Sequence, residues 1–265
     1  MKQLIFCTLF FYLLFITACS NNNSSDDNTA QPVPVTPAIS YNIIRTLPHD
    51  TSYFTQGLEF YKGTLLEGTG MKGKSKLIQK EFPGGKVLKE LAIDPQYFGE
   101  GITVLRDTLY QLTWQEHKVL VYTAKDFKKV KELSLNTEGW GITNNGKELI
   151  VSDGSNNLYF YEPSNLKLLR TQGITENGEP AVNLNELEFI DGFVYANQWQ
   201  YSYIIKIDTN SGQVVGKMDF SAIIKQVNAK YPYAEYFNGI AYNPETKKMY
   251  VTGKNWPEIF EIQMP

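Results

Sequence analysis

The sequence predicts an all-β fold, a five-bladed β-propeller, on three observations. First, a polar or aromatic residue directly precedes a short strand-like run at five places, in TQGLEF, GEGITV, GWGITN, LNELEF and FNGIAY. Second, the marker positions of these segments lie 44, 40, 45 and 53 residues apart, a period typical of propeller blades and not of helical solenoids. Third, each interval holds further strand-like runs. The markers are Gly57, Gly101, Gly141, Glu186 and Gly239.

Each complete repeat contains four strand-like runs separated by turn residues. In the second repeat the runs are 101–105, 108–114, 118–123 and 130–135, with Asp107 in the first turn. The third repeat has matching runs at 142, 149–153, 157–161 and 166–171, and the fourth at 187–190, 193–198, 203–208 and 214–218. The turns FPGG (82–85) and DTNSG (208–212) supply proline, asparagine and glycine. We therefore expect four-stranded antiparallel blades.

The last repeat has three runs, 240–242, 248–252 and 258–263, before the chain ends at Pro265. Residues 41–47 precede the first repeat and have strand character. We expect this N-terminal strand to join the C-terminal blade as its fourth strand and to close the ring.

The first forty residues differ from the rest of the chain. Residues 1–18 contain Lys2 and an apolar run too short to span a bilayer, and small residues precede Cys19, which favours a bacterial lipoprotein signal peptide. An ordinary signal peptide with a chance cysteine is the alternative. Residues 19–40 would be the lipidated Cys19 and a disordered tether, and residues 41–265 the propeller domain. We expect export and a lipid anchor in the cell-envelope membrane, periplasmic or at the cell surface.

Composition excludes several classes of function. With 25 basic and 28 acidic residues the chain offers no basic field for nucleic acid. Cys7 and Cys19 are the only cysteines, so the mature domain has neither a disulfide nor a thiolate. His49 and His117 are the only histidines and lie far apart in sequence, so we expect no metal and no cofactor, and place each histidine at the surface or in a hydrogen bond. We expect a monomer that contacts the membrane through its anchor only.

Equivalent positions of the repeat should form rings at one mouth of the central channel. The residue expected just before each innermost strand gives one ring, and the end of each second strand, which returns to the same face, gives another. Tryptophan near solvent and an isolated carboxylate favour a binding or catalytic site, with Glu100 the sharpest indication. For the amides, simple water binding explains the pattern equally well. The first ring consists of Gln56, Glu100, Trp140, Asn185 and Asn238. The second, outer ring consists of Gly70, Trp114, Gly154, Trp199 and Lys254.

The longest interval contains an insertion at residues 221–236. Ile223, Ile224 and Val227 recur at helical spacing, and an aromatic stretch follows. We expect a short helix and a loop over one face, either as a structural cap or as a lid that contacts substrate.

The motifs FTQG (54–57), FGEG (98–101), GWG (139–141), LNELE (184–188), NQW (197–199) and GKNW (253–256) resemble the glutaminyl cyclotransferase family of plants and bacteria, over essentially all of 41–265. The resemblance implies a five-bladed propeller, unrelated to the zinc-dependent animal enzymes, that converts an N-terminal glutamine of peptides or proteins to pyroglutamate and releases ammonia. It implies Glu100 as the catalytic acid/base. The implied substrate-binding residues are Phe54, Gln56, Phe98, Trp114, Trp140, Asn185, Trp199 and Lys254.

This chemistry fits the residues, because the substrate supplies both nucleophile and electrophile and no serine or cysteine nucleophile is needed. Our hypothesis is that Glu100 moves the protons while Gln56, Asn185 and Lys254 bind the amide oxygen. The alternative from another class is a non-catalytic, lipid-anchored propeller that binds a peptide or glycan. A binding module has no need of an isolated carboxylate among these side chains.

Overall fold

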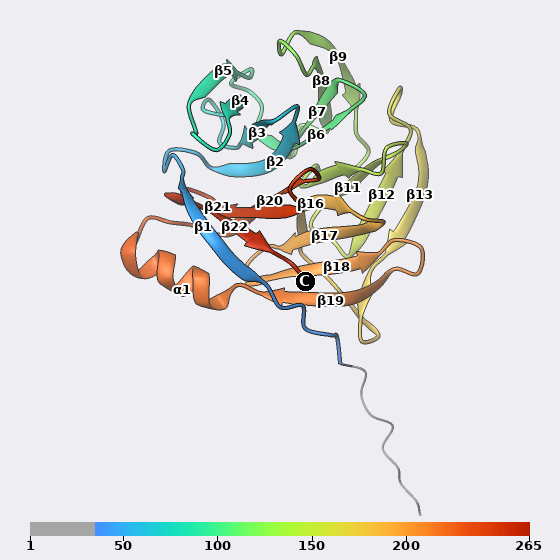
Figure 1. Ribbon diagram of the computed structural model, residues 1–265. Coiled ribbons are helices and arrows are strands. Elements are labelled where there is room, and N and C mark those ends of the chain that lie inside the picture. The colour runs from blue at the N-terminus through green and yellow to red at the C-terminus, as the bar shows by residue number, and fades with distance from the viewer. Residues whose placement is uncertain (1–34) are drawn as a thin grey trace, which may run out of the picture. The chain divides into compact units, whose positions relative to one another are not determined.

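The computed structural model describes residues 35–265 and contains five antiparallel sheets arranged as the blades of a ring (Figure 1). The predicted five-bladed propeller is therefore confirmed. The signal peptide, Cys19 and all but the end of the tether lie outside the described residues. Among the described residues no helix is long and apolar enough to cross a membrane.

The blades follow one another around the ring, and the strands nearest its axis are β2, β6, β10, β16 and β20 (Figure 1). Blade 1 comprises β2 (Thr55–Tyr61), β3 (Thr64–Thr69), β4 (Lys76–Glu81) and β5 (Val87–Ala92). Blade 2 comprises β6 (Gly99–Leu105), β7 (Thr108–Thr113), β8 (Lys118–Thr123) and β9 (Lys129–Ser134). Blade 3 comprises β10 (Ile142–Asn144), β11 (Leu149–Ser152), β12 (Asn157–Tyr161) and β13 (Leu168–Gly173).

Blade 4 carries two strands that the sequence did not indicate. Its main strands are β16 (Leu184–Ile190), β17 (Phe193–Gln198), β18 (Tyr203–Asp208) and β19 (Gln213–Asp219). The short hairpin β14 (Thr175–Glu176) and β15 (Glu179–Pro180) joins this sheet, because β14 pairs in parallel with β19. The hairpin and residues 37–39, which bond to the backbone of Lys217, cover the outer edge of this blade.

Blade 5 closes the ring with strands from both ends of the described chain. It comprises β20 (Phe237–Asn243), β21 (Lys248–Gly253), β22 (Glu258–Gln263) and the N-terminal β1 (Asn42–Pro48). β1 runs antiparallel to β22, with Asn42 opposite Gln263 and Pro48 opposite Glu258. Arg45 bonds to Glu261 across this pair at 2.6 Å. The expected closure by the N-terminal strand is confirmed.

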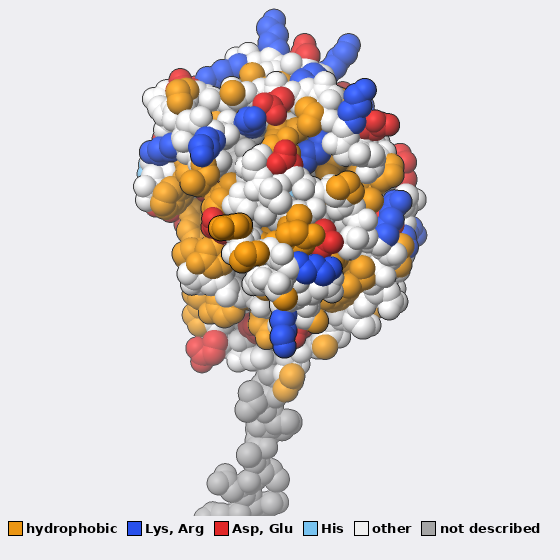
Figure 2. Space-filling view, turned by 90° about the vertical axis from the view of Figure 1, so that its left-hand side faces the viewer, with side chains coloured by type: hydrophobic (Ala, Val, Ile, Leu, Met, Phe, Trp, Pro, Cys, Tyr) orange, Lys and Arg blue, Asp and Glu red, His pale blue; other side chains and the backbone are white. Residues whose placement is uncertain are grey.

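The core consists of apolar side chains packed between neighbouring blades. Leu112 and Val119 of blade 2, for example, are fully buried in one cluster with Ile142 and Leu149 of blade 3. The outermost strands of blades 1 and 2, β5 and β9, are largely exposed and carry lysines and glutamates, as suits edge strands that must not pair with other chains. Figure 2 shows basic and acidic side chains interspersed over one face, in keeping with the near-balanced composition.

The innermost strands contain irregularities that correct one expectation. Gln56, Glu100, Asn185 and Asn238 do not precede their strands but lie inside β2, β6, β16 and β20. At each of them the pairing register with the second strand shifts, as in a β-bulge. Only Trp140 stands before its strand, β10, as expected.

The insertion forms the predicted short helix, α1 (Ser221–Lys230). Ile223 and Val227 are buried in the same cluster as Phe237 of blade 5 and Met218 of blade 4, so the helix is part of the core between these two blades. The loop that follows it runs back to the mouth of the channel and delivers Tyr236 there. The helix is thus a structural cap, and the end of its loop contributes to the pocket described next.

Candidate active site

One pocket of about 350 Å³ opens at the mouth of the central channel. All nine residues that the sequence placed in a catalytic or substrate-binding role line it, together with Tyr236. Every blade contributes at least one of them. The lining residues are Phe54, Gln56, Phe98, Glu100, Trp114, Trp140, Asn185, Trp199, Tyr236 and Lys254.

The bulges explain why polar side chains of the innermost strands face this pocket. A bulge adds a residue to one strand and redirects its side chain, and bulges are frequent beside functional sites. Gln56, Glu100 and Asn185 each occupy such a position and are almost completely buried. The bulge recurs in four blades, and in three of them it presents a different side chain to the same pocket.

A second repeated feature identifies Tyr236, which sequence reasoning missed. In the four blades with a bulge, the residue after the second strand donates its backbone N–H to the residue two positions before the bulge. The bonds run from Gly70 to Phe54, from Trp114 to Phe98, from Trp199 to Asn183 and from Lys254 to Tyr236, at 2.8 to 3.1 Å. Tyr236 is therefore equivalent to Phe54 and Phe98, and aligning the repeats from two residues earlier would have found it.

Six aromatic rings form the wall of the pocket in two groups, with neighbouring rings meeting edge to face. In the first group Phe98 contacts Phe54 and Trp114, with ring centroids 6.2 and 5.6 Å apart. In the second group Trp199 contacts Trp140 and Tyr236 at 5.7 and 5.6 Å. Such a wall is apolar and rigid, and its ring faces favour a cation or methylene groups.

Glu138 joins the two groups from outside the pocket. Its Oε2 accepts hydrogen bonds from the indole Nε1 atoms of Trp114 and Trp140, at 2.9 and 3.1 Å. One carboxylate thereby fixes the orientation of two rings. The sequence gave no indication of this role, because Glu138 lies in a connection between blades and does not recur in the repeat.

Two glycines at the mouth of the channel, Gly70 and Gly154, leave room for aromatic side chains. A Cβ atom at Gly70 would lie 2.5 Å from the ring of Phe98, and one at Gly154 would lie 2.6 Å from the ring of Trp140. The φ angle of Gly154 is +82°, a conformation that residues with a side chain rarely adopt. Because these two residues have no side chain, the neighbouring aromatic ring can lie against their backbone.

Glu100 and Lys254 are the charged groups of the pocket, and both are more than nine-tenths buried. Burial raises the pKa of Glu100 well above its ordinary value; the nearby Lys254 opposes this, and Glu116 and Glu138 add to it. Burial likewise lowers the pKa of Lys254, against the attraction of Glu100 and Glu235. The Lys254 ammonium lies 4.6 Å from the centroid of the Phe54 ring. The pocket thus favours a protonated Glu100.

Gln56, one of the two amides that line the pocket, is oriented by a neighbour. Asn238 Nδ2 donates to Gln56 Oε1 at 3.2 Å and to the backbone oxygen of Thr55 at 3.1 Å. Since the Gln56 oxygen already accepts a bond, its NH₂ group is the part that can donate to a ligand. Asn185 offers a second amide across the pocket.

Neither histidine lines the pocket. His49 is buried in a hydrogen-bond network, and His117 is exposed with Nδ1 2.8 Å from the backbone oxygen of Thr137. Among residues 35–265 no three His, Cys, Asp or Glu side chains are grouped as ligands of a metal ion.

The fold and the pocket together define a class: five-bladed propellers with a buried carboxyl group and a buried lysine inside an aromatic pocket at one channel mouth. The model of the Glutamine cyclotransferase family matches residues 12–264, and the chain belongs to that family. It is 34% identical over 226 residues to the glutaminyl-peptide cyclotransferase of Arabidopsis thaliana, an alignment that covers 84% of this chain and 70% of the plant protein. The crystal structure of Myxococcus xanthus glutaminyl cyclase superimposes with a TM-score of 0.80 at 33% identity, covering 86% of this chain and 98% of the other.

Proposed function

We propose that this protein is a glutaminyl-peptide cyclotransferase that converts an N-terminal glutamine into pyroglutamate and releases ammonia. The observation that carries the proposal is the pocket with Glu100 at its base, buried and with a raised pKa, beside Lys254. The family membership and the names of the two relatives support the same activity.

The reaction needs little more than this pocket provides. The α-amine attacks the side-chain amide carbon of the same residue, so no enzyme nucleophile is required. Because the amine and the amide already belong to one residue, the enzyme has only to hold the conformer in which they meet and to supply the proton transfers. The aromatic wall excludes water and holds the methylene groups of the glutamine, and its ring faces suit the amine end.

Glu100 moves the protons in this proposal. The neutral amine attacks, the C–N bond of the lactam forms, and the protonated carboxyl gives its proton to the departing amide nitrogen as that C–N bond breaks. The other carboxylate oxygen takes the proton from the new ring nitrogen, so the carboxyl ends as it began. The high pKa of Glu100 favours the acidic form that this sequence starts from.

The amide oxygen gains negative charge as the amine attacks. Lys254 and the Gln56 NH₂ group are buried donors in the pocket and would stabilise that charge, with Asn185 as a third donor. Fixed donors in a pocket without bulk water act more strongly than the same groups in solution.

The direct test is an assay of the purified protein with a peptide that begins with glutamine, following ammonia release and the loss of ammonia from the peptide by mass spectrometry. The same peptide beginning with asparagine is the matched control, because its amide is one methylene too short to form the five-membered ring. Turnover that persists in excess chelator would support a reaction without metal. Binding of the glutamine peptide without any ammonia release would instead favour the non-catalytic binding module.

We also propose that the domain is tethered to the cell envelope by lipid on Cys19, which the sequence before that cysteine supports. Expression of the full-length chain with Cys19→Ser tests this. The wild type should fractionate with membranes and the variant should not; equal fractionation of the two would refute the anchor.

A further inference from the structure

The loop between β21 and β22, residues 254–257, carries Lys254 and belongs to blade 5. On one side it bonds to the end of the insertion: Lys254 N–H donates to the Tyr236 oxygen at 2.9 Å, and Glu235 N–H donates to the Lys254 oxygen at 2.8 Å. These two bonds fix the loop to the backbone beside Tyr236, one of the aromatic residues that line the pocket.

On its other side the loop bonds to the segment that leads from β1 into blade 1. His49 N–H donates to the Pro257 oxygen and Asn255 N–H donates to the Tyr53 oxygen, both at 2.8 Å. This segment continues into Phe54 and Gln56, which line the pocket from blade 1. The placement of Lys254 relative to these two residues thus depends on noncovalent contacts at the junction of the first and last blades, because β1 continues into blade 1 but meets the rest of blade 5 only by pairing with β22.

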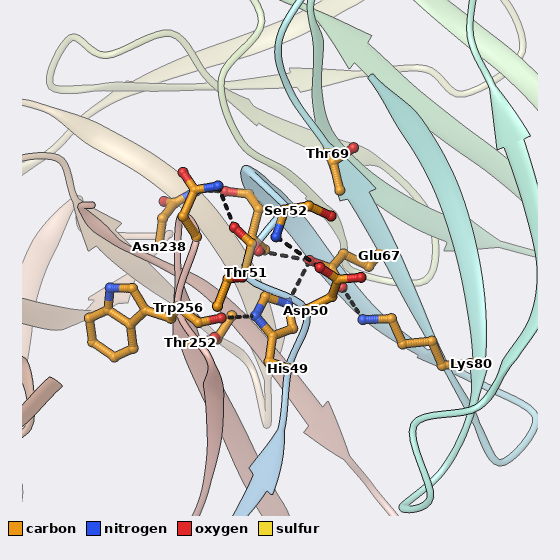
Figure 3. Close-up of polar contacts among 12 residues, drawn as sticks. His49, Asp50, Thr51, Ser52, Glu67, Thr69, Lys80, Asn238, Thr252 and Trp256 are labelled. Atoms are coloured by element: carbon orange, nitrogen blue, oxygen red, sulfur yellow. Dashed lines mark hydrogen bonds and ion pairs between the residues drawn. The ribbon is translucent and has the colours of Figure 1, made fainter. Parts of the chain in front are cut away.

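A buried charge network stands at this junction (Figure 3). His49 Nδ1 lies 2.6 Å from the backbone oxygen of Trp256, and its Nε2 lies 2.9 Å from Glu67 Oε1. Thr55, next to Gln56 in sequence, donates its hydroxyl to the same Glu67 oxygen at 2.7 Å. Lys80 Nζ bonds to Glu67 Oε2 at 2.5 Å. The network therefore connects the Lys254 loop to the strand that carries Gln56.

Both ring nitrogens of His49 face oxygen atoms that accept hydrogen bonds. A backbone oxygen cannot donate, and Glu67 accepts from the Lys80 ammonium and from the Thr55 hydroxyl, as a carboxylate does. A neutral imidazole has only one N–H and would leave a lone pair against one of these oxygens. Both contacts are made only by the doubly protonated ring. The side chains of His49 and Glu67 are completely buried, so water does not replace a missing bond.

The surroundings of His49 fit a cation. Glu67 faces it from β3, and Asp50 follows it in the chain with a pKa lowered first by the Ser52 backbone N–H and further by the charges of His49 and Lys80. The Tyr53 ring packs edge to face against the imidazole with centroids 5.9 Å apart, and Lys80 lies over that same ring at 4.5 Å. Glu67 separates the two cations by accepting from both.

We propose that His49, Glu67 and Lys80 are positioning residues for the catalytic pocket, with His49 as an imidazolium that fixes the Lys254 loop of blade 5 against the Gln56 strand of blade 1. None of the three lines the pocket, so none is catalytic. The proposal rests on the proposed cyclotransferase function for its kinetic consequence, but its structural part can be tested without any substrate.

The first test is nitrogen NMR of the imidazole groups in the purified full chain at neutral pH. The chain has two histidines, so the His117→Gln variant leaves only the His49 signals. We expect both ring nitrogens of His49 to carry a proton. A ring with one bare nitrogen would overturn the proposal.

The second test compares His49→Phe, Glu67→Gln and Arg45→Met at a temperature well below the melting temperature of each. Arg45 is the matched control because its ion pair with Glu261 joins the same two chain ends but lies on the strands, away from the Lys254 loop. In the His49 and Glu67 variants we expect the backbone amides of Lys254 and Asn255 to exchange with solvent at least tenfold faster. In the Arg45 variant we expect them to remain as in the wild type.

Kinetics separate positioning from general stability. We expect kcat for a glutamine peptide to fall about tenfold or more in the His49 and Glu67 variants, with a smaller change in KM, because small displacements of a catalytic group are costly. Arg45→Met should keep both constants. Unchanged kcat and amide exchange in both network variants, or equal losses in the Arg45 variant, would overturn the proposal. If the wild type shows no turnover at all, the proposed cyclotransferase function is wrong. The NMR and amide-exchange results still decide whether His49 is doubly protonated and whether the network fixes the Lys254 loop.

Discussion

Replacing Glu100 with glutamine gives the sharpest test of the chemistry. The change keeps the size of the side chain and removes its ability to give up and recover a proton. Of the residues that line the pocket, only Lys254 and Tyr236 also carry an exchangeable acidic proton, and neither can replace a carboxyl group in both proton steps. We therefore expect the variant to bind substrate but to turn it over very slowly.

The expected size follows from the burial of the group. Positioned acid/base catalysts contribute about 10² to 10⁴ in rate, and Glu100 is 5% exposed, so bulk water has little access to take over its role. We expect kcat to fall about 10³-fold, which corresponds to about 4 kcal/mol in the activation free energy. KM should change by less than about threefold, since the glutamine amide keeps the shape of the pocket.

We expect Glu100→Gln to stabilise the folded protein at neutral pH although it lowers kcat. Because the pKa of Glu100 is raised in the folded state, the wild type loses stability as the pH rises above the ordinary value of 4.5 toward the folded value. The Glu100→Gln variant carries no such loss, so its melting temperature should exceed that of the wild type at neutral pH and the difference should vanish at acid pH. Thermal melts at several pH values measure this.

Glu188→Gln is the matched control. Glu188 is also a buried channel carboxyl whose pKa is raised, first by burial and then by Glu59 and Glu186, but it does not line the pocket. It accepts a hydrogen bond from Tyr242 N–H at 2.9 Å, which the glutamine oxygen can still accept. We expect a similar gain in stability with unchanged kcat. If Glu100→Gln keeps kcat within threefold of the wild type, the assignment of Glu100 as acid/base is refuted.

Three further predictions concern the surroundings of Glu100. In Lys254→Met the alkaline limb of the plot of kcat against pH should move to higher pH. The reason is that Lys254 lowers the pKa of Glu100, so without it Glu100 stays protonated to a higher pH. An alkaline limb that stays in place or moves to lower pH contradicts this. Glu138→Ala leaves two indole N–H groups without their acceptor, so KM should rise about three- to tenfold in steady-state assays, and an unchanged KM would argue against the role of Glu138. Gly154→Ala places a Cβ atom 2.6 Å from Trp140 at φ +82°, so chemical denaturation should show a loss of about 1–3 kcal/mol, whereas wild-type stability would show that the ring can move without cost.

The sequence predicted the number of blades, the ring closure and seven of the nine pocket residues, because all of these follow from a repeated pattern with equivalent positions. The other two, Phe54 and Phe98, were implied only by the resemblance of their motifs to the family. It did not predict the bulges, since a register shift depends on pairing with the second strand and leaves no periodic mark in the first. It also could not predict Glu138 or the network around His49. These contacts join connections that occur once, and single connections have no equivalent elsewhere in the chain with which to compare them.

The arrangement of charges around the ring explains why such unique contacts are needed. Glu100 belongs to blade 2 and Lys254 to the loop after β21 of blade 5, while β2 of blade 1 packs against the innermost strands of both neighbours. The acid and the cation therefore lie on the two blades that flank a third blade. The distance between them depends on how that third blade packs against each of its two neighbours. One of these two interfaces is the junction of blades 5 and 1, where β1 continues into blade 1 but meets the rest of blade 5 only by pairing with β22. A repeat can copy the strands, but only contacts specific to that junction can fix the position of Lys254 relative to Glu100, and His49 and Glu67 are buried at that point.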